Sequence, residues 1–290
     1  MVTTAFLFSG QGAQAVGMGS FALQFAPAAE LFRRAGEILG IDLLKTCLEG
    51  PQETLNRTDV CQPALLVHGL AALEWRRSRG DLPEAEAAAG LSLGEYTAHV
   101  FAGSLTFEDG VALVMKRGRY MQEACDATPS GMASILGLDR AKVAQACEGL
   151  VDVANLNGPG QIVISGEAKA LEAAVAKCKA AGARRAIPLK VAGAYHSRVM
   201  KSAQEKMRQE LAQVKIAPPR IPVYANVNAK PLTDPGEIRE ALAAQVCGSV
   251  LWEDTIRAIG AKTYFEFGPG RLLAGLVFKI DPAALCESVE

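Results

Sequence analysis

Apolar and polar positions alternate along this chain in a way that predicts strands and helices in turn. The apolar run at 4–8, TAFLF, leads into a glycine-rich loop, which is typical of a buried strand. An amphipathic helix is predicted over 63–79, and the segment 85–103 fits a short strand, a sharp turn and a helix. A further helix is predicted over 107–125, where apolar residues recur at the 3.6-residue spacing of a buried face. Such alternation predicts a layered α/β core with a mainly parallel sheet.

The rhythm of the pattern changes between residues 130 and 191. We expect strands over 131–138 and 183–191, two strands around the Asn-Gly-Pro-Gly turn at 157–160, and helices over 139–149 and 167–182. The order β-α-β-β-α-β is the ferredoxin-like pattern. We therefore predict a large α/β domain formed by residues 1–129 and 192–290, with residues 130–191 inserted as a small ferredoxin-like subdomain. The large domain resumes with a helix that Ser197 can cap and whose inner face carries Met200, Ala203, Met207 and Leu211.

Composition narrows the class of protein. With 290 residues, half of them hydrophobic, the chain can bury a large core. A formal net charge of -1 without blocks of like charge disfavours binding to nucleic acid or to an anionic membrane surface. No apolar stretch is long enough to span a bilayer, and the run at 5–8 is too short for a signal peptide. Seven scattered cysteines, none in a CxxC pair, argue against a disulfide framework or a zinc site, so we expect a reducing cytoplasm and no metal.

The stretch GLSLGEYTA at 90–98 places Ser92 between two glycines. This is the spacing of a nucleophile elbow, in which a sharp strand-to-helix turn holds the serine in a strained backbone conformation. A serine needs a base to become a nucleophile, and the chain has three histidines. His68 and His99 fall within predicted helices, where packing is the more usual role. His196 stands before a helix at the junction of the two domains, where loops place functional groups, so it is the candidate base.

Four stretches occur in order along the chain: FSGQGAQ at 8–14, GLSLGEYTA at 90–98, GAYHS at 193–197 and FEFGPGRLLAGL at 265–276. Together they resemble the malonyl-CoA:acyl carrier protein transacylases of fatty acid and polyketide synthesis, and the resemblance covers essentially the whole chain. It implies an α/β-hydrolase-like core with the small subdomain inserted. It also implies an acyltransferase that supplies malonyl units for fatty acid synthesis, a malonyl-CoA substrate, an acyl carrier protein partner and no cofactor. We expect a monomer.

The resemblance also assigns roles to residues. Ser92 would attack the thioester of malonyl-CoA, His196 would take its proton, and the malonyl group would rest on Ser92 until the carrier's phosphopantetheine thiol collects it. In the family a backbone carbonyl orients the histidine. We expect that carbonyl in the stretch Ser249-Val250-Leu251, centred on Val250, with Asn226 nearby. The backbone N–H of Leu93 and Gln11 of the GQG loop would form the oxyanion hole. Taken by itself, the loop at Gln11 could also be an ordinary turn or a phosphate cradle, but a Walker lysine and a GxGxxG spacing are both missing.

Arg117 decides which acyl group is expected. From its helical position it could be a surface arginine that lays its stem along apolar neighbours, one turn from Met121. By resemblance it clamps the free carboxylate of malonate through two parallel hydrogen bonds. Tyr195 stands where malonyl-specific members often have phenylalanine, and its ring is expected to crowd a branched α-carbon, which favours malonyl over methylmalonyl. Leu91 departs from the family, which usually has histidine before the nucleophile, and this places acyl selectivity in question.

Two alternatives from other functional classes remain open. A serine hydrolase also needs only an elbow serine and a histidine, although Arg117 and the lack of an evident acidic triad partner disfavour it. A catalytically silent scaffold that binds the carrier protein would not need Ser92, His196 and Gln11 together with Arg117. Exposure to malonyl-CoA distinguishes the three: a transferase accumulates a covalent malonyl adduct, a hydrolase releases free CoA continuously, and a scaffold does neither.

Overall fold

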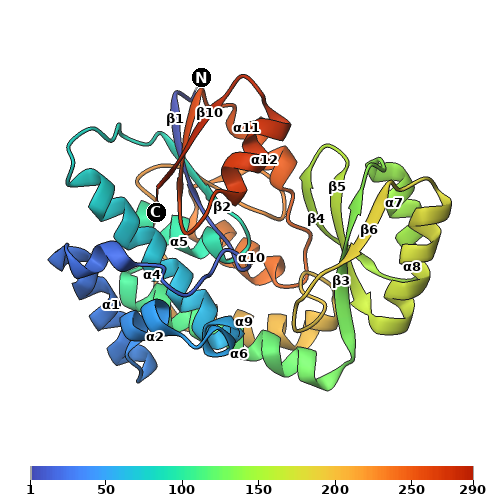
Figure 1. The fold of residues 1–290 in the computed structure, drawn as a ribbon, viewed down its shortest axis with the longest axis horizontal. Coiled ribbons are helices and arrows are strands. Elements are labelled where there is room, and N and C mark those ends of the chain that lie inside the picture. The colour runs from blue at the N-terminus through green and yellow to red at the C-terminus, as the bar shows by residue number, and fades with distance from the viewer. Residues whose placement is uncertain (1, 290) are drawn as a thin grey trace.

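Two β-sheets organise the molecule, which the computed structural model describes from residue 2 to residue 289 (Figure 1). The strands of the larger sheet are β1 (Thr4–Phe8), β2 (Ala87–Gly90), β7 (Val223–Tyr224), β8 (Pro231–Leu232), β9 (Thr263–Phe267) and β10 (Leu285–Val289). They lie in the order β10-β9-β1-β2-β7-β8. Each neighbouring pair is parallel except β7 with β8. The predicted α/β architecture with a mainly parallel sheet is confirmed.

Helices cover both faces of the larger sheet, so its central strand, β1, is buried on both sides. Along β1, Phe6 and Phe8 belong to one core cluster and Ala5 and Leu7 to another, as the two-residue period of a strand requires. The cluster around Phe6 is built with η1 (Ser20–Leu23), α1 (Ala26–Leu39), α2 (Leu43–Glu49), α3 (Gln52–Asn56), α4 (Thr58–Arg77), α5 (Leu93–Ala102), α6 (Phe107–Ala127), η2 (Arg198–Met200), α9 (Lys201–Gln213) and α10 (Pro235–Gln245). The cluster around Leu7 is built with α11 (Trp252–Ile259) and α12 (Leu272–Ile280).

The smaller sheet lies beside the larger one and has its own core (Figure 1). Its strands are β3 (Ser130–Leu136), β4 (Asp152–Gly158), β5 (Gln161–Glu167) and β6 (Arg185–Pro188). All three neighbouring pairs in the order β4-β5-β3-β6 are antiparallel, and α7 (Arg140–Cys147) and α8 (Ala168–Ala180) pack on this sheet. The β-α-β-β-α-β order is as predicted. The two sheets separate near residues 129 and 191, while the independence of each part as a domain stays a prediction.

Two helical segments begin at positions that can be compared with the sequence prediction. The long helix is predicted to begin at Pro63, but α4 begins at Thr58 and encloses Pro63. After the smaller sheet, Ser197 accepts a hydrogen bond from the backbone N–H of Val199, 3.3 Å away, and caps η2, which runs directly into α9. The four apolar residues predicted for the inner face of this segment are all fully buried: Met200, Ala203, Met207 and Leu211.

The two sheets are tied together on the side where they face each other. Val250, in the loop before α11, pairs with β4: its N–H donates to the carbonyl of Ala154 over 2.8 Å, and its carbonyl accepts from the N–H of Leu156 over 2.9 Å. Arg198 also forms an ion pair with Asp152 of β4. Within residues 2–289, no helix has both the length and the apolar character needed to cross a membrane.

Candidate active site

Ser92 occupies a tight turn between the end of β2 and the start of α5. Its φ of 54° lies in the left-handed region, which L-residues rarely adopt. The flanking glycines are required by close packing: a Cβ at Gly90 would lie 2.0 Å from the backbone of Gly94, and a Cβ at Gly94 would lie 2.1 Å from the carbonyl oxygen of Phe8. The turn therefore presents the serine hydroxyl at the end of the sheet, where a strained backbone is typical of functional residues.

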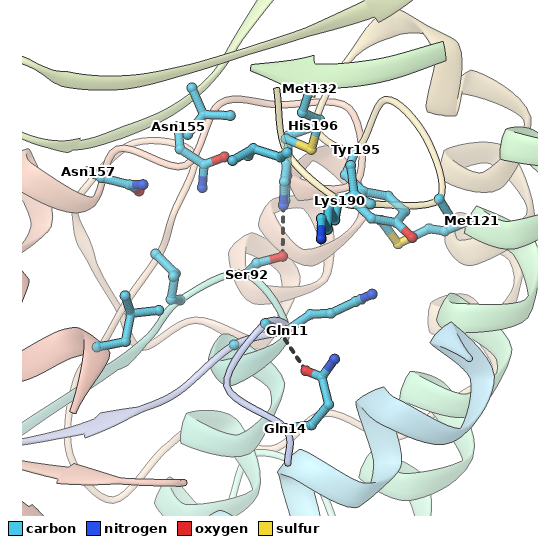
Figure 2. A pocket seen from close by; sticks show the side chains of 18 of the residues that line it. Gln11, Gln14, Ser92, Met121, Met132, Asn155, Asn157, Lys190, Tyr195 and His196 are labelled. Carbon is cyan, nitrogen blue, oxygen red and sulfur yellow. Dashed lines mark hydrogen bonds between the residues drawn. The ribbon is translucent and has the colours of Figure 1, made fainter. Parts of the chain in front are cut away.

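A cavity of about 380 Å³ opens over Ser92 between the two sheets. Figure 2 shows Met132, Asn155 and Asn157 on the side of the smaller sheet, with Gln11 and Gln14 on the other side. Other residues from both parts of the chain complete the lining: Leu91, Arg117, Met121, Lys190, Tyr195 and His196. The reactive hydroxyl thus lies at the bottom of a cleft to which both parts of the chain contribute.

His196 is placed to activate Ser92. Its Nε2 lies 2.7 Å from the Oγ of Ser92, although the two residues are 104 positions apart in the sequence (Figure 2). The Nδ1 of His196 lies 2.9 Å from the carbonyl oxygen of Gln245 and 3.2 Å from that of Gly248. Since carbonyl oxygens only accept hydrogen bonds, Nδ1 carries the proton and Nε2 is left as the acceptor for the serine O–H.

The orienting carbonyls correct the sequence prediction, which placed them in the stretch around Val250. Both backbone groups of Val250 are already engaged with β4. Gln245 is the last residue of α10, and the carbonyls at the end of a helix have no partner within it, so they are free to hold the imidazole. Asn226 is close, as expected, but it contacts the serine: its Oδ1 accepts from the N–H of Ser92 over 2.7 Å, and its Nδ2 donates to the carbonyl of Gly90.

The pKa of His196 supports its role as a proton acceptor. Burial, and to a smaller extent the positive charge of Arg117, lower this pKa to about 4, although the hydrogen bonds to Gln245 and Gly248 act in the opposite direction. The imidazole is therefore neutral at pH 7. A neutral imidazole with a free Nε2 lone pair is the form that can take the proton of Ser92.

The other two histidines serve the core. His68 and His99 are both buried, and neither lines the cavity. Burial lowers the pKa of His68 to about 4 and that of His99 to about 3. Since a histidine in an unfolded chain has a pKa of about 6.5, the unfolded protein binds more protons than the folded protein between pH 4 and 6.5, and stability rises with pH across this window.

We expect His68→Phe to make the protein less sensitive to acid. The ring of His68 packs edge-on against Phe21, and neither ring nitrogen has a hydrogen-bond partner within residues 2–289, so phenylalanine keeps the aromatic contact without a group to protonate. The unfolding free energy of the native protein should fall between pH 7.5 and pH 5, and the variant should lose about 2 kcal/mol less. Urea unfolding at both pH values measures this difference, and an equal loss in the two proteins would contradict it.

Arg117 reaches the site from the inside of α6. Its side chain is 1% exposed, so the alternative of a surface arginine is wrong. One guanidinium nitrogen donates to Ser92 Oγ over 3.1 Å and to Gln245 Oε1 over 3.0 Å, and the other donates to Gln62 Oε1 over 2.8 Å. Arg117 makes no ion pair with any of residues 2–289. A buried cation held by neutral groups next to a nucleophile is suited to an anionic substrate.

The remaining predicted residues lie around this centre. Tyr195 is buried beside the cavity, and its hydroxyl lies 3.1 Å from the Oγ1 of Thr58. Met121 and Leu91 line the cavity and are also buried. Leu91 places an apolar side chain immediately before the nucleophile. The roles in substrate choice that we expect for these residues stay predictions.

The two expected oxyanion donors come from the loop after β1 and from the start of α5. Leu93 is the first residue of α5, where backbone N–H groups have no partner within the helix. Gln11 lines the cavity from the loop after β1. That loop is held in shape by Gln14, whose Oε1 accepts from the N–H of Gly12 over 2.8 Å and whose Nε2 donates to Asn56 (Figure 2). The arrangement combines a nucleophile, a base, available N–H donors and a buried cation, which is the equipment for acyl transfer.

Sequence reasoning missed three buried polar side chains that hold the site together: Gln62, Glu95 and Gln245. Gln245 donates to the carbonyl of Ser92 and to Glu95, and accepts from Arg117. The available signal was a polar residue within an apolar helical stretch, as in DVCQPALLV around Gln62 and ALAAQV around Gln245. Each such residue must find a hydrogen-bond partner inside the protein.

Comparison with known proteins gives matches along nearly the whole chain. The family described as the acyl transferase domain matches residues 5–267. The malonyl CoA-acyl carrier protein transacylase of Salmonella typhimurium is 43% identical over an alignment of 309 positions, which covers 100% of this chain and 99% of that protein.

Solved structures agree with this result. An acyl carrier protein S-malonyltransferase from Vibrio cholerae has a TM-score of 0.95 and 39% identity, and the match covers 99% of this chain and 97% of that one. A malonyl-transacylase in complex with its type II polyketide synthase acyl-carrier protein also has a TM-score of 0.95, at 38% identity, with 99% of this chain and 96% of that one covered.

Proposed function

This chain belongs to the acyl transferase domain family, and we propose that it transfers the malonyl group of malonyl-CoA to the phosphopantetheine thiol of acyl carrier protein through a malonyl ester of Ser92. The relatives described above are named as malonyl transferases, and the structure of one of them is a complex with its acyl-carrier protein. The product would be a malonyl unit on the carrier, as used in fatty acid or polyketide synthesis.

The reaction proceeds in two half-reactions. His196 Nε2 takes the proton of Ser92 while Oγ forms a bond to the thioester carbon. The oxygen anion of the tetrahedral intermediate is stabilised by N–H donors from Gln11 and Leu93. The carbon–sulfur bond then breaks, and the CoA sulfur leaves with the proton from His196. In the second half, the carrier thiol gives its proton to His196, attacks the ester, and Ser92 recovers its proton.

The burial of Arg117 next to Ser92 is the observation that most favours malonyl as the substrate. Its guanidinium is buried and donates to the very oxygen that would carry the acyl group. The free carboxylate of malonate is one methylene away from the acyl carbon, so a malonyl group on Ser92 Oγ would bring its carboxylate within reach of Arg117. The pair can form two parallel charge-assisted hydrogen bonds. An enzyme for uncharged acyl groups would gain nothing from this buried cation.

We expect Arg117→Ala to abolish the preference for malonyl. The malonyl carboxylate would then be buried without its partner, which typically costs about 2–5 kcal/mol. Malonyl transfer should fall by roughly 30-fold to several thousandfold, while the weak transfer of acetyl is spared. The measured quantity is the malonyl-to-acetyl ratio of kcat/KM, which cancels general damage to the fold.

Arg119→Ala is the matched control. Arg119 lies on the same helix, but its side chain is 73% exposed and pairs with Glu123 on the surface, so its loss should leave the ratio unchanged. If Arg117→Ala lowers transfer of both acyl groups equally, Arg117 is structural and the malonyl assignment loses its support.

The alternatives of a hydrolase and a silent scaffold are separated by intact-protein mass spectrometry after mixing with malonyl-CoA. A transferase accumulates one malonyl group per chain and holds it until carrier protein is added. Continuous release of CoA without carrier would identify a hydrolase, and an unmodified mass would identify a scaffold. Repeating the measurement with methylmalonyl-CoA tests whether Tyr195 excludes a branched acyl group and how Leu91 affects selectivity.

A basic side chain at the cavity supports an acidic acyl carrier protein as the partner. Lys190 lines the cavity. Arg185 is the first residue of β6, the strand that leads to Lys190, and Arg184 precedes it. Carrier proteins are expected to be acidic, so these side chains are candidates for steering the partner to the opening.

The proposal includes no cofactor and no metal, since the thioester already activates the acyl group. Within residues 2–289 no cluster of three or more His, Cys, Asp or Glu side chains could hold a metal ion. We further propose that the protein is a monomer in the cytoplasm, a reducing compartment that suits the seven free cysteines.

A further inference from the structure

Glu95 is a buried acid that the reaction described above does not use. It lies in the first turn of α5 and is 0% exposed. Its Oε2 accepts from Gln245 Nε2 over 2.6 Å and from the backbone N–H of Asn226 over 3.1 Å. Its Oε1 has no hydrogen-bond partner within residues 2–289. Burial of an ionised carboxyl group is costly unless the charge is paired and hydrogen-bonded.

Gln245 links this acid directly to Arg117. The same amide group donates from Nε2 to Glu95 and accepts at Oε1 from the Arg117 guanidinium over 3.0 Å. In the described part of the chain, Glu95 is the carboxyl group that acts electrostatically on Arg117. The other two groups that act on it are the phenols of Tyr96 and Tyr195. A single bridging amide therefore separates one buried anion from one buried cation.

We propose that Glu95 is the resting counter-charge of Arg117 and sets how strongly the site prefers an acyl group that carries a carboxylate. The inference rests on the function proposed above, in which Arg117 receives the malonyl carboxylate. With Glu95 ionised, Arg117 is already partly balanced and gains less from malonate. With Glu95 neutral, Arg117 lacks a counter-charge, and the malonyl carboxylate supplies it.

The protonation of Glu95 makes this preference depend on pH. Burial raises the pKa of Glu95 to about 7, against the opposing effects of Gln245, Asn226 and Arg117. The elements packed against α5 are β1, β2, α4, α6 and β7. Their other titratable groups on buried faces are His68 and Cys61 of α4, Cys125 of α6 and Tyr224 of β7. Helix α5 itself adds Tyr96 and His99, and the neighbouring loop adds His196. Burial raises the pKa of both thiols, so they are neutral near pH 7. All three histidines have lowered pKa values and all the tyrosines raised ones, so Glu95 and Arg117 are the charged pair near pH 7.

The coupling between a proton on Glu95 and a carboxylate at Arg117 is mutual. A malonyl carboxylate repels the charge of Glu95 and favours uptake of a proton from solvent, and a proton on Glu95 favours the malonyl carboxylate by the same factor. The carboxylate of malonate has an ordinary carboxylic acid pKa of about 4, so it stays ionised above pH 6. The change with pH is therefore a property of the protein.

The test measures acylation of Ser92 by malonyl-CoA and by acetyl-CoA between pH 6 and pH 9, using intact-protein mass spectrometry after short reaction times. In the native protein, the malonyl-to-acetyl ratio should fall by about 5-fold or more as pH rises through 7. In Glu95→Gln, which keeps the acceptor for Gln245 but has no charge, the ratio should stay at its low-pH value throughout. Titration of His196 affects both acyl groups and cancels in the ratio.

Arg119→Gln, which removes an exposed basic group from the same helix as Arg117, is the control, and its ratio should keep the native pH dependence. A malonyl-to-acetyl ratio that does not change with pH in the native protein overturns the inference. This measurement uses the native protein alone, so it does not depend on whether a variant folds. A parallel loss of both activities in Glu95→Gln, with the pH dependence retained, would assign Glu95 a structural role and also overturn it. Absence of any malonyl adduct in the native protein would instead refute the proposed function.

Discussion

Replacement of Ser92 by alanine is expected to abolish the malonyl adduct completely. No other side chain is placed to receive the acyl group: Ser92 Oγ is the atom that lies 2.7 Å from the base and 3.1 Å from the guanidinium. Alanine keeps the size of the residue and its strained turn, so the loss should be chemical. Intact-protein mass spectrometry after incubation with malonyl-CoA should show an unmodified chain, with transfer to the carrier protein at the level of the uncatalysed reaction.

Ser202→Ala provides the matched control, because Ser202 lies exposed on α9 and should leave the adduct unchanged. If Ser92→Ala still carried one malonyl group, the acyl group would be held elsewhere, and the elbow serine would lose its role.

Replacement of His196 is expected to slow acylation of Ser92 by roughly 10² to 10⁴, which is the usual contribution of a positioned general base. The variant of choice is His196→Asn, together with His196→Ala. His196 has a φ of 55°, and asparagine tolerates this left-handed conformation better than alanine, so the pair separates backbone strain from lost chemistry. Single-turnover acylation, followed by mass spectrometry, measures the rate of the first half-reaction alone.

Both His196 variants should be slow by a similar factor while their unfolding midpoints differ. Near-native acylation in either variant would remove His196 from the mechanism.

The sequence pattern predicted the architecture well because the larger sheet and the smaller one follow simple periods. Phe6 and Phe8 alternate with Ala5 and Leu7 between two cores, and the order of elements in 130–191 is legible as a run of short apolar segments. Ser92 and His196 could also be found, the first from its flanking glycines and the second because only two other histidines compete with it. These signals are local, or need only a short list of candidates.

The contacts that orient and charge the site could not be predicted in the same way. The carbonyl that holds His196 was sought near Val250, but whether a carbonyl is free depends on pairing across the molecule, here with β4. The burial of Arg117 was not evident either, because a charged residue at the flank of an apolar helical face can point to solvent or to the interior. Glu95 lay inside the nucleophile motif, but its link to Arg117 passes through Gln245, 150 residues further along the chain.

The order of the strands has a consequence for the synthesis of the protein. All pairings of the smaller sheet lie within residues 130–188, so this sheet can form while the rest of the chain is still being made. The first strand of the larger sheet, β1, pairs with β9, which is complete only at Phe267, and His196 is held by the carbonyl of Gln245. Contacts so distant along the chain form late, and N-terminal segments emerge first from the ribosome. A growing chain therefore carries Ser92 for most of its synthesis without an oriented base, and competence for acyl transfer arrives with the last few strands.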